Sequence, residues 1–198
     1  MRTRIRLHYP NSSISSRTST SFYVADFSER TKKDRKIEVH HSIPPCPLNS
    51  DKSMDCVEII NKKGLSIDFN FFDDNQFKDN ENNDIEHCEG CFYPTINHDK
   101  SWIAMIEIKD CKTKNISNYK DKVIEQIVSA TTIFRNKNII TSHKVYGIIA
   151  MPRNKASFND TIFGMPPKYK ELKMKHKILF AATNQVVIID DTKLKCNE

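Results

Sequence analysis

An acidic and a basic side chain two residues apart, Glu107 and Lys109, end a strongly apolar segment that begins at Trp102. Side chains alternate between the two faces of a β-strand, so Glu107 and Lys109 share one face while Ile106 and Ile108 occupy the other. Burying a carboxylate and an ammonium costs free energy unless the two are paired or serve a function. This segment is therefore the first candidate for a chemical site.

The acid-x-Lys tripeptide is weak on its own, because it occurs five times, at 34–36, 107–109, 110–112, 171–173 and 191–193. Only the copy at 107–109 ends an apolar strand that precedes an amphipathic helix. The alternative to a functional site is an ordinary Glu–Lys pair on a half-exposed strand, worth about 0.5 kcal/mol. The context of the copy at 107–109 favours the site.

A second carboxylate is expected from the strand that precedes this one. The segments 88–95 and 102–109 are predicted to form a hairpin whose turn is centred between residues 98 and 99, which brings residues 89 and 90 opposite 107 and 108. Glu89 is therefore the predicted partner of Glu107, to within one residue of register. Asp84 and Glu86, in the loop before it, are the alternatives.

Asp99 is excluded from this site. About eight residues of extended strand separate it from Glu107, and at about 3.3 Å per residue they hold the two roughly 25 Å apart.

A helix is predicted from Asn118, as its N-cap, to about residue 135. Its apolar face repeats at about 100° per residue and consists of Val123, Ile127, Ala130 and Phe134. Gln126 lies at the border of that face, whereas Glu125 points towards solvent. Gln126 is therefore the helix residue expected to reach back towards the strand ends.

The elements that carry these residues follow the order β-β-α-β from residue 88, with the last of these strands at 145–151. An irregular basic stretch and a pair of strands, 178–182 and 186–189, complete the chain. The mixed pattern predicts an α/β fold around one sheet.

The first part of the chain is expected to contribute less to the fold. Residues 1–50 are predicted to be an irregular N-terminal segment, and residues 51–198 to form one domain. Strands at 56–60 and 65–72 are predicted to pair as a hairpin, and residues 73–84 to form an inserted, exposed acidic loop.

These parts together resemble the PD-(D/E)xK, or restriction-endonuclease-like, nuclease superfamily over roughly residues 85–190. The resemblance lies in Glu89-Gly90 before a hairpin, Glu107-Ile108-Lys109 at the end of the next strand, and Glu125-Gln126-Ile127 in the following helix. It implies an αβββαβ core, that is, a mixed central sheet flanked by helices. Two features depart from the family pattern: Glu89 stands where Asp is usual, and no core helix is readable before residue 88. The segments 24–40 and 49–60 are the candidates for that helix.

The resemblance also implies a chemistry. Glu89 and Glu107 would bind Mg²⁺ or Mn²⁺. Lys109 would orient the attacking water or stabilise the transition state, and Gln126 would position the lysine, the water or the nucleic acid.

The implied activity is that of a metal-dependent DNA endonuclease in defence against foreign DNA, such as antiviral defence, or in repair. RNA is the alternative substrate, and a homodimer or a partner subunit is expected because cutting two strands takes two sites. The alternatives are a catalytically silent module on the same fold that binds nucleic acid or protein, and a small interaction or immunity protein.

Charge is distributed unevenly along the chain. Residues 1–99 hold 13 Lys and Arg against 16 Asp and Glu, whereas residues 100–198 hold 18 against 9. A basic half can bind polyanions, although lysines also simply solubilise a surface. Within the basic segment 166–177, Lys168, Tyr169, Lys170 and Lys173 are candidates for nucleic-acid contacts, with a solvated loop or helix face as the alternative.

The remaining features bear on compartment and on other metals. Six scattered cysteines are expected to be reduced thiols. Cys88-x-x-Cys91, with His87 and His98 nearby, could form part of a zinc site, although half-buried cysteines are the better interpretation. No apolar run approaches the roughly 20 residues of a membrane span, so no membrane association is expected, and the cytoplasm is the expected location.

Overall fold

The computed structural model describes residues 1–28, 37–73, 75–164 and 166–196, without the side chains of residues 166–168. The acid-x-Lys copy at 34–36 and residues 29–36 of the candidate helix segment 24–40 therefore lie outside the described residues.

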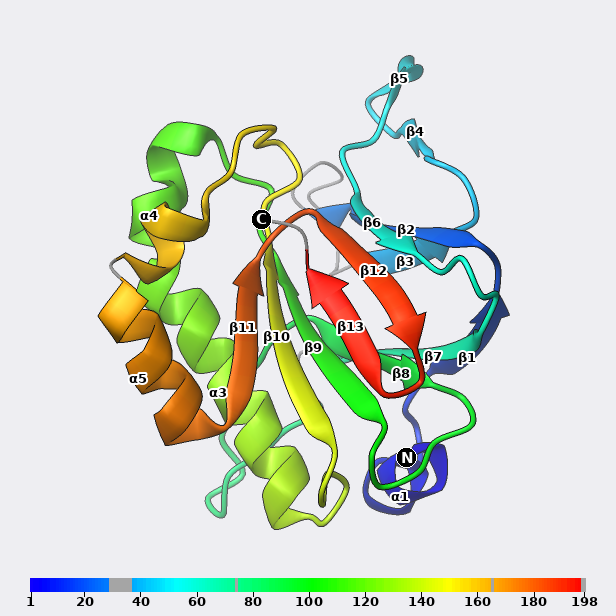
Figure 1. Cartoon of the computed structure of the whole chain (residues 1–198), viewed down its shortest axis with the longest axis vertical. Helices are drawn as coiled ribbons and strands as arrows, with labels where there is room; N and C mark the ends of the chain where they lie inside the picture. The colour runs from blue at the N-terminus through cyan, green and yellow to red at the C-terminus, as the bar shows by residue number, and fades with distance from the viewer. Residues whose placement is uncertain (29–36, 74, 165, 197–198) are drawn as a thin grey trace.

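A six-stranded mixed sheet, in the order β1-β7-β8-β9-β10-β11, forms the centre of the molecule (Figure 1). Its strands are β1 (Ile14–Thr18), β7 (Ser66–Phe71), β8 (Gly90–Pro94), β9 (Trp102–Ile108), β10 (Lys144–Ala150) and β11 (Ile178–Ala182). The strands from β1 to β9 pair antiparallel, whereas β9, β10 and β11 pair parallel. Parallel neighbours need a crossover connection, and helices supply it between β9 and β10 and between β10 and β11.

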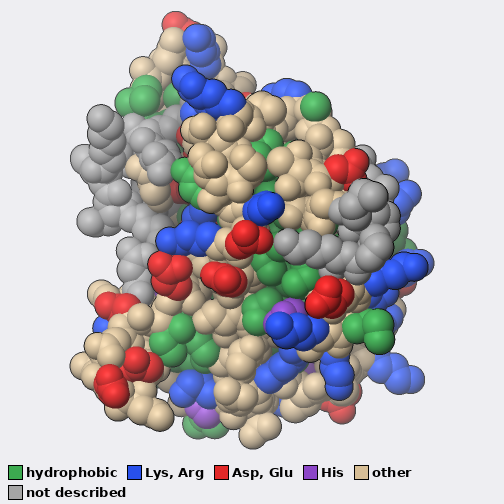
Figure 2. Space-filling view, turned by 90° about the vertical axis from the view of Figure 1, so that its left-hand side faces the viewer, with side chains coloured by type: hydrophobic (Ala, Val, Ile, Leu, Met, Phe, Trp, Pro, Cys, Tyr) green, Lys and Arg blue, Asp and Glu red, His purple; other side chains and the backbone are tan. Residues whose placement is uncertain are grey.

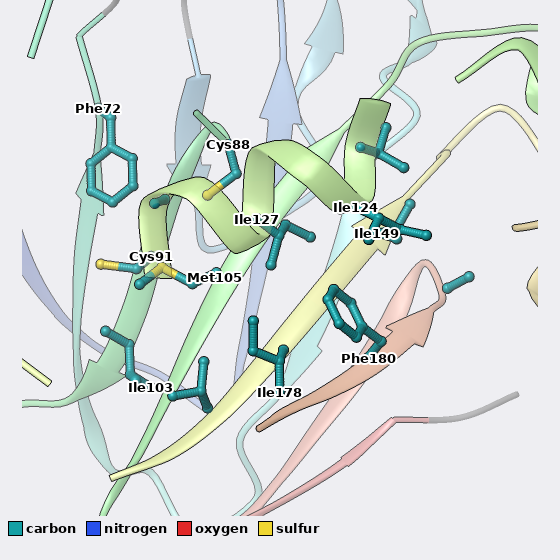
Figure 3. Close-up of a cluster of buried hydrophobic side chains, with 14 of the residues drawn as sticks. Phe72, Cys88, Cys91, Ile103, Met105, Ile124, Ile127, Ile149, Ile178 and Phe180 are labelled. Atoms are coloured by element: carbon teal, nitrogen blue, oxygen red, sulfur yellow. The ribbon is translucent and has the colours of Figure 1, made fainter. Parts of the chain in front are cut away.

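Helices cover one face of this sheet (Figure 1). They are α1 (Arg2–His8), the 3₁₀ helix η1 (Thr113–Asn118), α3 (Lys120–Asn136), α4 (Asn159–Phe163) and α5 (Pro166–His176). Figure 3 shows Ile124 and Ile127 of α3 pointing towards the strands, with Met105 and Ile149 among the side chains that meet them. The four residues predicted to form the apolar face of this helix are all completely buried, which confirms that face.

A second sheet covers the other face, in the order β13-β12-β6-β2-β3. Its strands are β2 (Ser21–Asp26), β3 (Ile37–His40), β6 (Val57–Ile60), β12 (Gln185–Asp190) and β13 (Lys193–Cys196). A separate apolar core lies between the two sheets and includes Phe22, Ile59, Trp102, Ile148 and Val186. β9 is therefore buried on both faces, as its continuous apolar sequence requires.

The expected mixed α/β class is confirmed, but the expectation of one sheet flanked by helices is wrong, because a second sheet covers the face opposite the helices. Several expected elements are also wrong. Residues 1–50 are not irregular, because α1, β1 and β2 lie there, together with β3 and the two-stranded β4 (Pro45–Cys46) and β5 (Asn49–Ser53). β1 pairs with β7, so the N-terminal segment extends the central sheet. The candidate core helix at 49–60 is also wrong, because β5 and β6 occupy it.

Both predicted strand pairs outside the central meander are wrong. β6 and β7 lie in different sheets, and so do β11 and β12. Each short connection carries the chain from one layer to the other, because the apolar faces of its two strands face the core between the sheets from opposite sides. Strand pattern and turn residues do not distinguish a hairpin from such a change of layer.

The acidic segment 73–84 and the start of the main helix also differ from expectation. Phe77 is 1% exposed and contacts the rings of Phe72, His87 and Phe134, so it anchors a segment predicted to be exposed throughout. Asn118 does not cap α3, because it ends η1 and α3 follows from Lys120.

Within the described ranges, none of the helices combines the length and the apolar character that crossing a membrane requires.

Protonation of His143 is expected to destabilise the protein. His143 is 8% exposed, its Nε2 is 2.9 Å from Asn97 Oδ1, and its Nδ1 accepts from the backbone N–H of Thr141 at 3.4 Å. Burial, followed by the positive charges of the N-terminus and Arg4, lowers the pKa of His143. The unfolded chain therefore binds the proton more tightly, so this contribution to stability is lost as pH falls below about 6.5.

We expect the free energy of unfolding to fall more steeply between pH 7 and pH 5 in the wild type than in His143→Gln. Urea denaturation at a series of pH values measures this difference. The exposed His41→Gln is the control and should keep the wild-type slope. Equal slopes in the wild type and His143→Gln would contradict the assignment.

Candidate functional site

Glu107 is the last but one residue of β9 and is completely buried. It lies on the same face as Ile103 and Met105, towards the helices, whereas Ile106 and Ile108 contribute to the core between the sheets. The predicted alternation of faces along this strand is therefore confirmed.

Lys109 follows directly after β9 and remains attached to the sheet. Its backbone N–H donates to Ala150 O at 2.9 Å, which extends the ladder between β9 and β10 by one residue. Its Nζ lies 2.6 Å from Glu107 Oε1. The side chain is 23% exposed, so the ammonium lies where the buried carboxylate meets the surface.

Glu89 precedes β8 and lies beside Glu107. Gly90 pairs with Ile106, and the backbone N–H of Glu89 donates to Glu107 Oε2 at 3.1 Å. The Glu89 side chain is 7% exposed, and its Oε1 is 4.0 Å from Lys109 Nζ. The structure thus brings together the three residues that were predicted to meet, with the register shifted by one residue from the centre of the prediction.

Gly90 allows β8 to approach β7 closely at this point. A Cβ atom at Gly90 would lie 2.5 Å from the backbone O of Asn70, closer than van der Waals contact permits. The backbone N–H of Phe72 donates to Glu89 O at 2.9 Å, which fixes the residue on the other side. The glycine next to Glu89 is therefore required by strand packing.

The two alternative acids lie elsewhere. Asp84 Oδ1 is 2.5 Å from Lys78 Nζ, in the acidic segment. Glu86 is exposed, and its Oε1 accepts from Lys122 Nζ at 3.0 Å. Both acids form surface ion pairs, so Glu89 is the acid that shares a buried site with Glu107.

Gln126 reaches towards the segment that carries Glu89, as predicted. It is 8% exposed, and its Nε2 donates to the backbone O of His87 at 3.2 Å. Its Oε1 is buried and has no hydrogen-bond partner within the part of the chain that is described. Glu125 is exposed, as expected. A buried amide oxygen without a partner costs free energy, which is a common mark of a site that meets a ligand or water.

Two carboxylates and one ammonium give this group of side chains a formal charge of −1. The neighbouring Cys88 responds to that charge, since burial and then the negative charge of Glu107 raise the pKa of its thiol.

The donor atoms suit a hard divalent cation. Carboxylate and amide oxygens are the ligands that Mg²⁺ prefers, and Mg²⁺ commonly binds through one or two carboxylates while water and phosphate complete its shell. Among the described residues there is no group of three His, Cys, Asp or Glu side chains that could hold a metal ion. Glu89 and Glu107 would therefore be the protein ligands, with the remaining positions left to water and substrate.

The zinc alternative has less support. Cys88 and Cys91 are completely buried, not half-buried, and burial raises the pKa of both thiols. Zinc binds the thiolate form, which this environment disfavours. His98 lies on the surface, with its Nε2 2.9 Å from Asp191 Oδ2.

Sequence reasoning missed the second ion pair at this end of the sheet. Asp110 follows Lys109, and Arg153 follows β10; Arg153 Nε is 3.4 Å from Asp110 Oδ1. The two residues are far apart in sequence, and only the parallel pairing of β9 with β10 brings the strand ends together. The acid of the tripeptide at 110–112 is Asp110, and it pairs with Arg153 at the end of the neighbouring strand.

The basic segment forms α5, and its candidate residues differ in role. The ring of Tyr169 packs edge-to-face against Phe163, and its hydroxyl donates to Phe180 O at 3.0 Å. Tyr169 therefore holds α5 against β11, and the contacts give no support for stacking on a base. Lys170 and Lys173 are exposed, and the side chain of Lys168 lies outside the described residues.

Comparisons of the chain with protein-family models, with curated proteins and with solved structures found no match.

The coupling between Glu107 and Lys109 can be measured with Glu107→Gln, Lys109→Met and the double variant. Removing Lys109 alone takes the ammonium away from two adjacent buried carboxylates, so we expect a loss of up to about 3 kcal/mol in stability. The double variant should lose less than the sum of the two single variants. Urea denaturation in EDTA gives the three values, and strict additivity would contradict the pairing.

Proposed function

We propose that this protein is a metal-dependent endonuclease that hydrolyses phosphodiester bonds in DNA through Glu89, Glu107, Lys109 and Gln126. One observation carries the proposal. Two buried carboxylates, one on β9 and one directly before β8, meet at one lysine at the end of the central strand. A purely structural core would be more stable with apolar side chains at these positions.

The order of elements supports the proposal. The antiparallel strands β7, β8 and β9, the crossover helix α3 and the parallel strand β10 follow the β-β-β-α-β order expected of a PD-(D/E)xK core. The seven-residue α1 precedes these strands in the chain. The second sheet, which is built from strands near both ends of the chain, would be an addition to that core.

Each residue would have a distinct task in hydrolysis. Glu89 and Glu107 would hold Mg²⁺ or Mn²⁺, which would lower the pKa of bound water and stabilise charge on the phosphate. Lys109, partly exposed beside them, can donate to the attacking water or to a phosphate oxygen. Gln126 has a free amide oxygen among the described contacts and can accept from water or orient the lysine.

A catalytically silent binding module is the second candidate, and one observation favours it. The 2.6 Å contact between Lys109 Nζ and Glu107 Oε1 already compensates the more buried carboxylate, so the site is stable without a cation. Glu89 in place of the usual Asp points the same way. Such a module would bind nucleic acid without cutting it.

Cleavage of supercoiled and linear DNA in Mg²⁺, Mn²⁺ or EDTA distinguishes these candidates. We expect metal-dependent cutting in the wild type, and a loss of about 100-fold or more in Glu107→Gln and in Lys109→Met, because both act on the reacting phosphate. Single-stranded RNA tested in parallel identifies the preferred nucleic acid.

Two control variants distinguish the loss of a site residue from a nonspecific effect of substitution. Lys112→Met changes the exposed lysine of the neighbouring acid-x-Lys copy, and Glu125→Gln changes the exposed neighbour of Gln126. Both should cut at the wild-type rate. Cutting that survives Glu107→Gln would place the active site elsewhere, and binding without cutting in any metal would favour the silent module.

A further inference from the structure

Four lysines surround a hollow on the surface of α5, remote from the carboxylate site. The hollow has a volume of about 570 Å³ and is lined by Lys144, Lys170, Lys173 and Lys177, together with His143, Val145, Met174 and Leu179. Lys170 and Lys173 lie three residues apart on α5, and Lys177 follows directly after the helix ends at His176, so the three lysines form one stripe along this side of the hollow. Lys144, at the start of β10, faces them.

The lining of this hollow contains cations but no carboxylate. Among the described residues, Lys170, Lys173 and Lys177 form no ion pair, while the fourth ammonium, on Lys144, donates to the backbone O of Thr192 at 3.2 Å. Glu171, the acidic residue of α5, is not part of the lining. Like charges that converge without a counter-charge repel one another, and a polyanion relieves that repulsion.

The surface around this hollow is distinct from the rest of the helical face. Figure 2 shows acidic and basic side chains intermixed across much of that face, with Lys and Arg side chains gathered towards the lower right, where α5 lies. The lining also includes the apolar side chains of Val145, Met174 and Leu179, so the lysine stems can lie along them and keep their ammonium groups in water.

We infer that this lysine hollow binds the phosphate backbone of nucleic acid, as a contact separate from the site of cleavage. The stripe from Lys170 to Lys177 extends about 10 Å along the helix, a length over which duplex DNA presents about six phosphate charges. Lysines are flexible point charges, which suits contacts that position a backbone without reading bases. The choice of nucleic acid over an acidic polypeptide rests on the proposed function.

The location of the hollow defines the role of this contact. Lys144 begins β10, and the residue of β10 opposite Glu107 is Ile149, five residues further on. The hollow and the carboxylate site are therefore at opposite ends of the strand, about 17 Å apart along it. A nucleic acid that contacts both the hollow and the carboxylate site would be bound over a longer stretch than one that contacts the carboxylate site alone.

The test is binding of a labelled 20-base-pair DNA duplex in EDTA, measured by fluorescence anisotropy over a series of salt concentrations. The variant Lys170→Gln/Lys173→Gln/Lys177→Gln removes the stripe and keeps a helix-forming residue at the two positions within α5. Lys52→Gln/Lys62→Gln/Lys63→Gln removes the same charge from exposed positions elsewhere and is the control. Thermal unfolding of each variant checks that it folds.

We expect the slope of log Kd against log salt concentration to fall by about 2 to 3 in the stripe variant, and by less than 1 in the control. Equal slopes in the two variants would overturn the inference. Polyglutamate that competes as well as DNA of equal charge would also overturn it, in favour of an acidic polypeptide. Because no metal is present, this result is independent of cleavage. Lysine-dependent binding by a protein that never cuts would leave the inference standing and the nuclease proposal without support.

Discussion

The packing of two carboxylates beside one lysine at the end of β9 is the constraint on which the site depends. Glu107 is completely buried, and it is held by the backbone N–H of Glu89 on one side and by Lys109 on the other. Isolated burial of a carboxylate would cost several kcal/mol, so these contacts must form together. Two carboxylates and one ammonium thus meet at one place, and we propose that the two carboxylates bind a cation there.

The two apolar cores explain why the carboxylates cannot move apart. β9 has the helices on one face and the second sheet on the other, so its residues are buried from Trp102 to Ile108. Glu107 therefore lies on the face towards the helices, with Ile103 and Met105. Close packing of Gly90 against β7 fixes Glu89 beside it.

The site was easier to predict from the sequence than the fold that surrounds it. Glu89, Glu107 and Lys109 lie within one hairpin, so local alternation and turn position were enough to bring them together. The position of Gln126 at the border of the apolar face followed from the periodicity of the predicted helix. The second sheet was not predictable in this way, because its strands come from distant parts of the chain and the short turns after β6 and β11 resemble hairpin turns while they connect different layers. Phe77 was missed because a single apolar residue in an acidic segment carries no periodic signal.

The central claim is that Glu89 and Glu107 hold a divalent cation between them. Crystals soaked in Mn²⁺ and measured at its absorption edge test this most directly, because anomalous scattering locates the ion itself. The account predicts a peak within coordination distance of both carboxylates in the wild type, and none in Glu107→Gln. A wild-type structure with no manganese at this site, and with Lys109 still paired to Glu107, would contradict it.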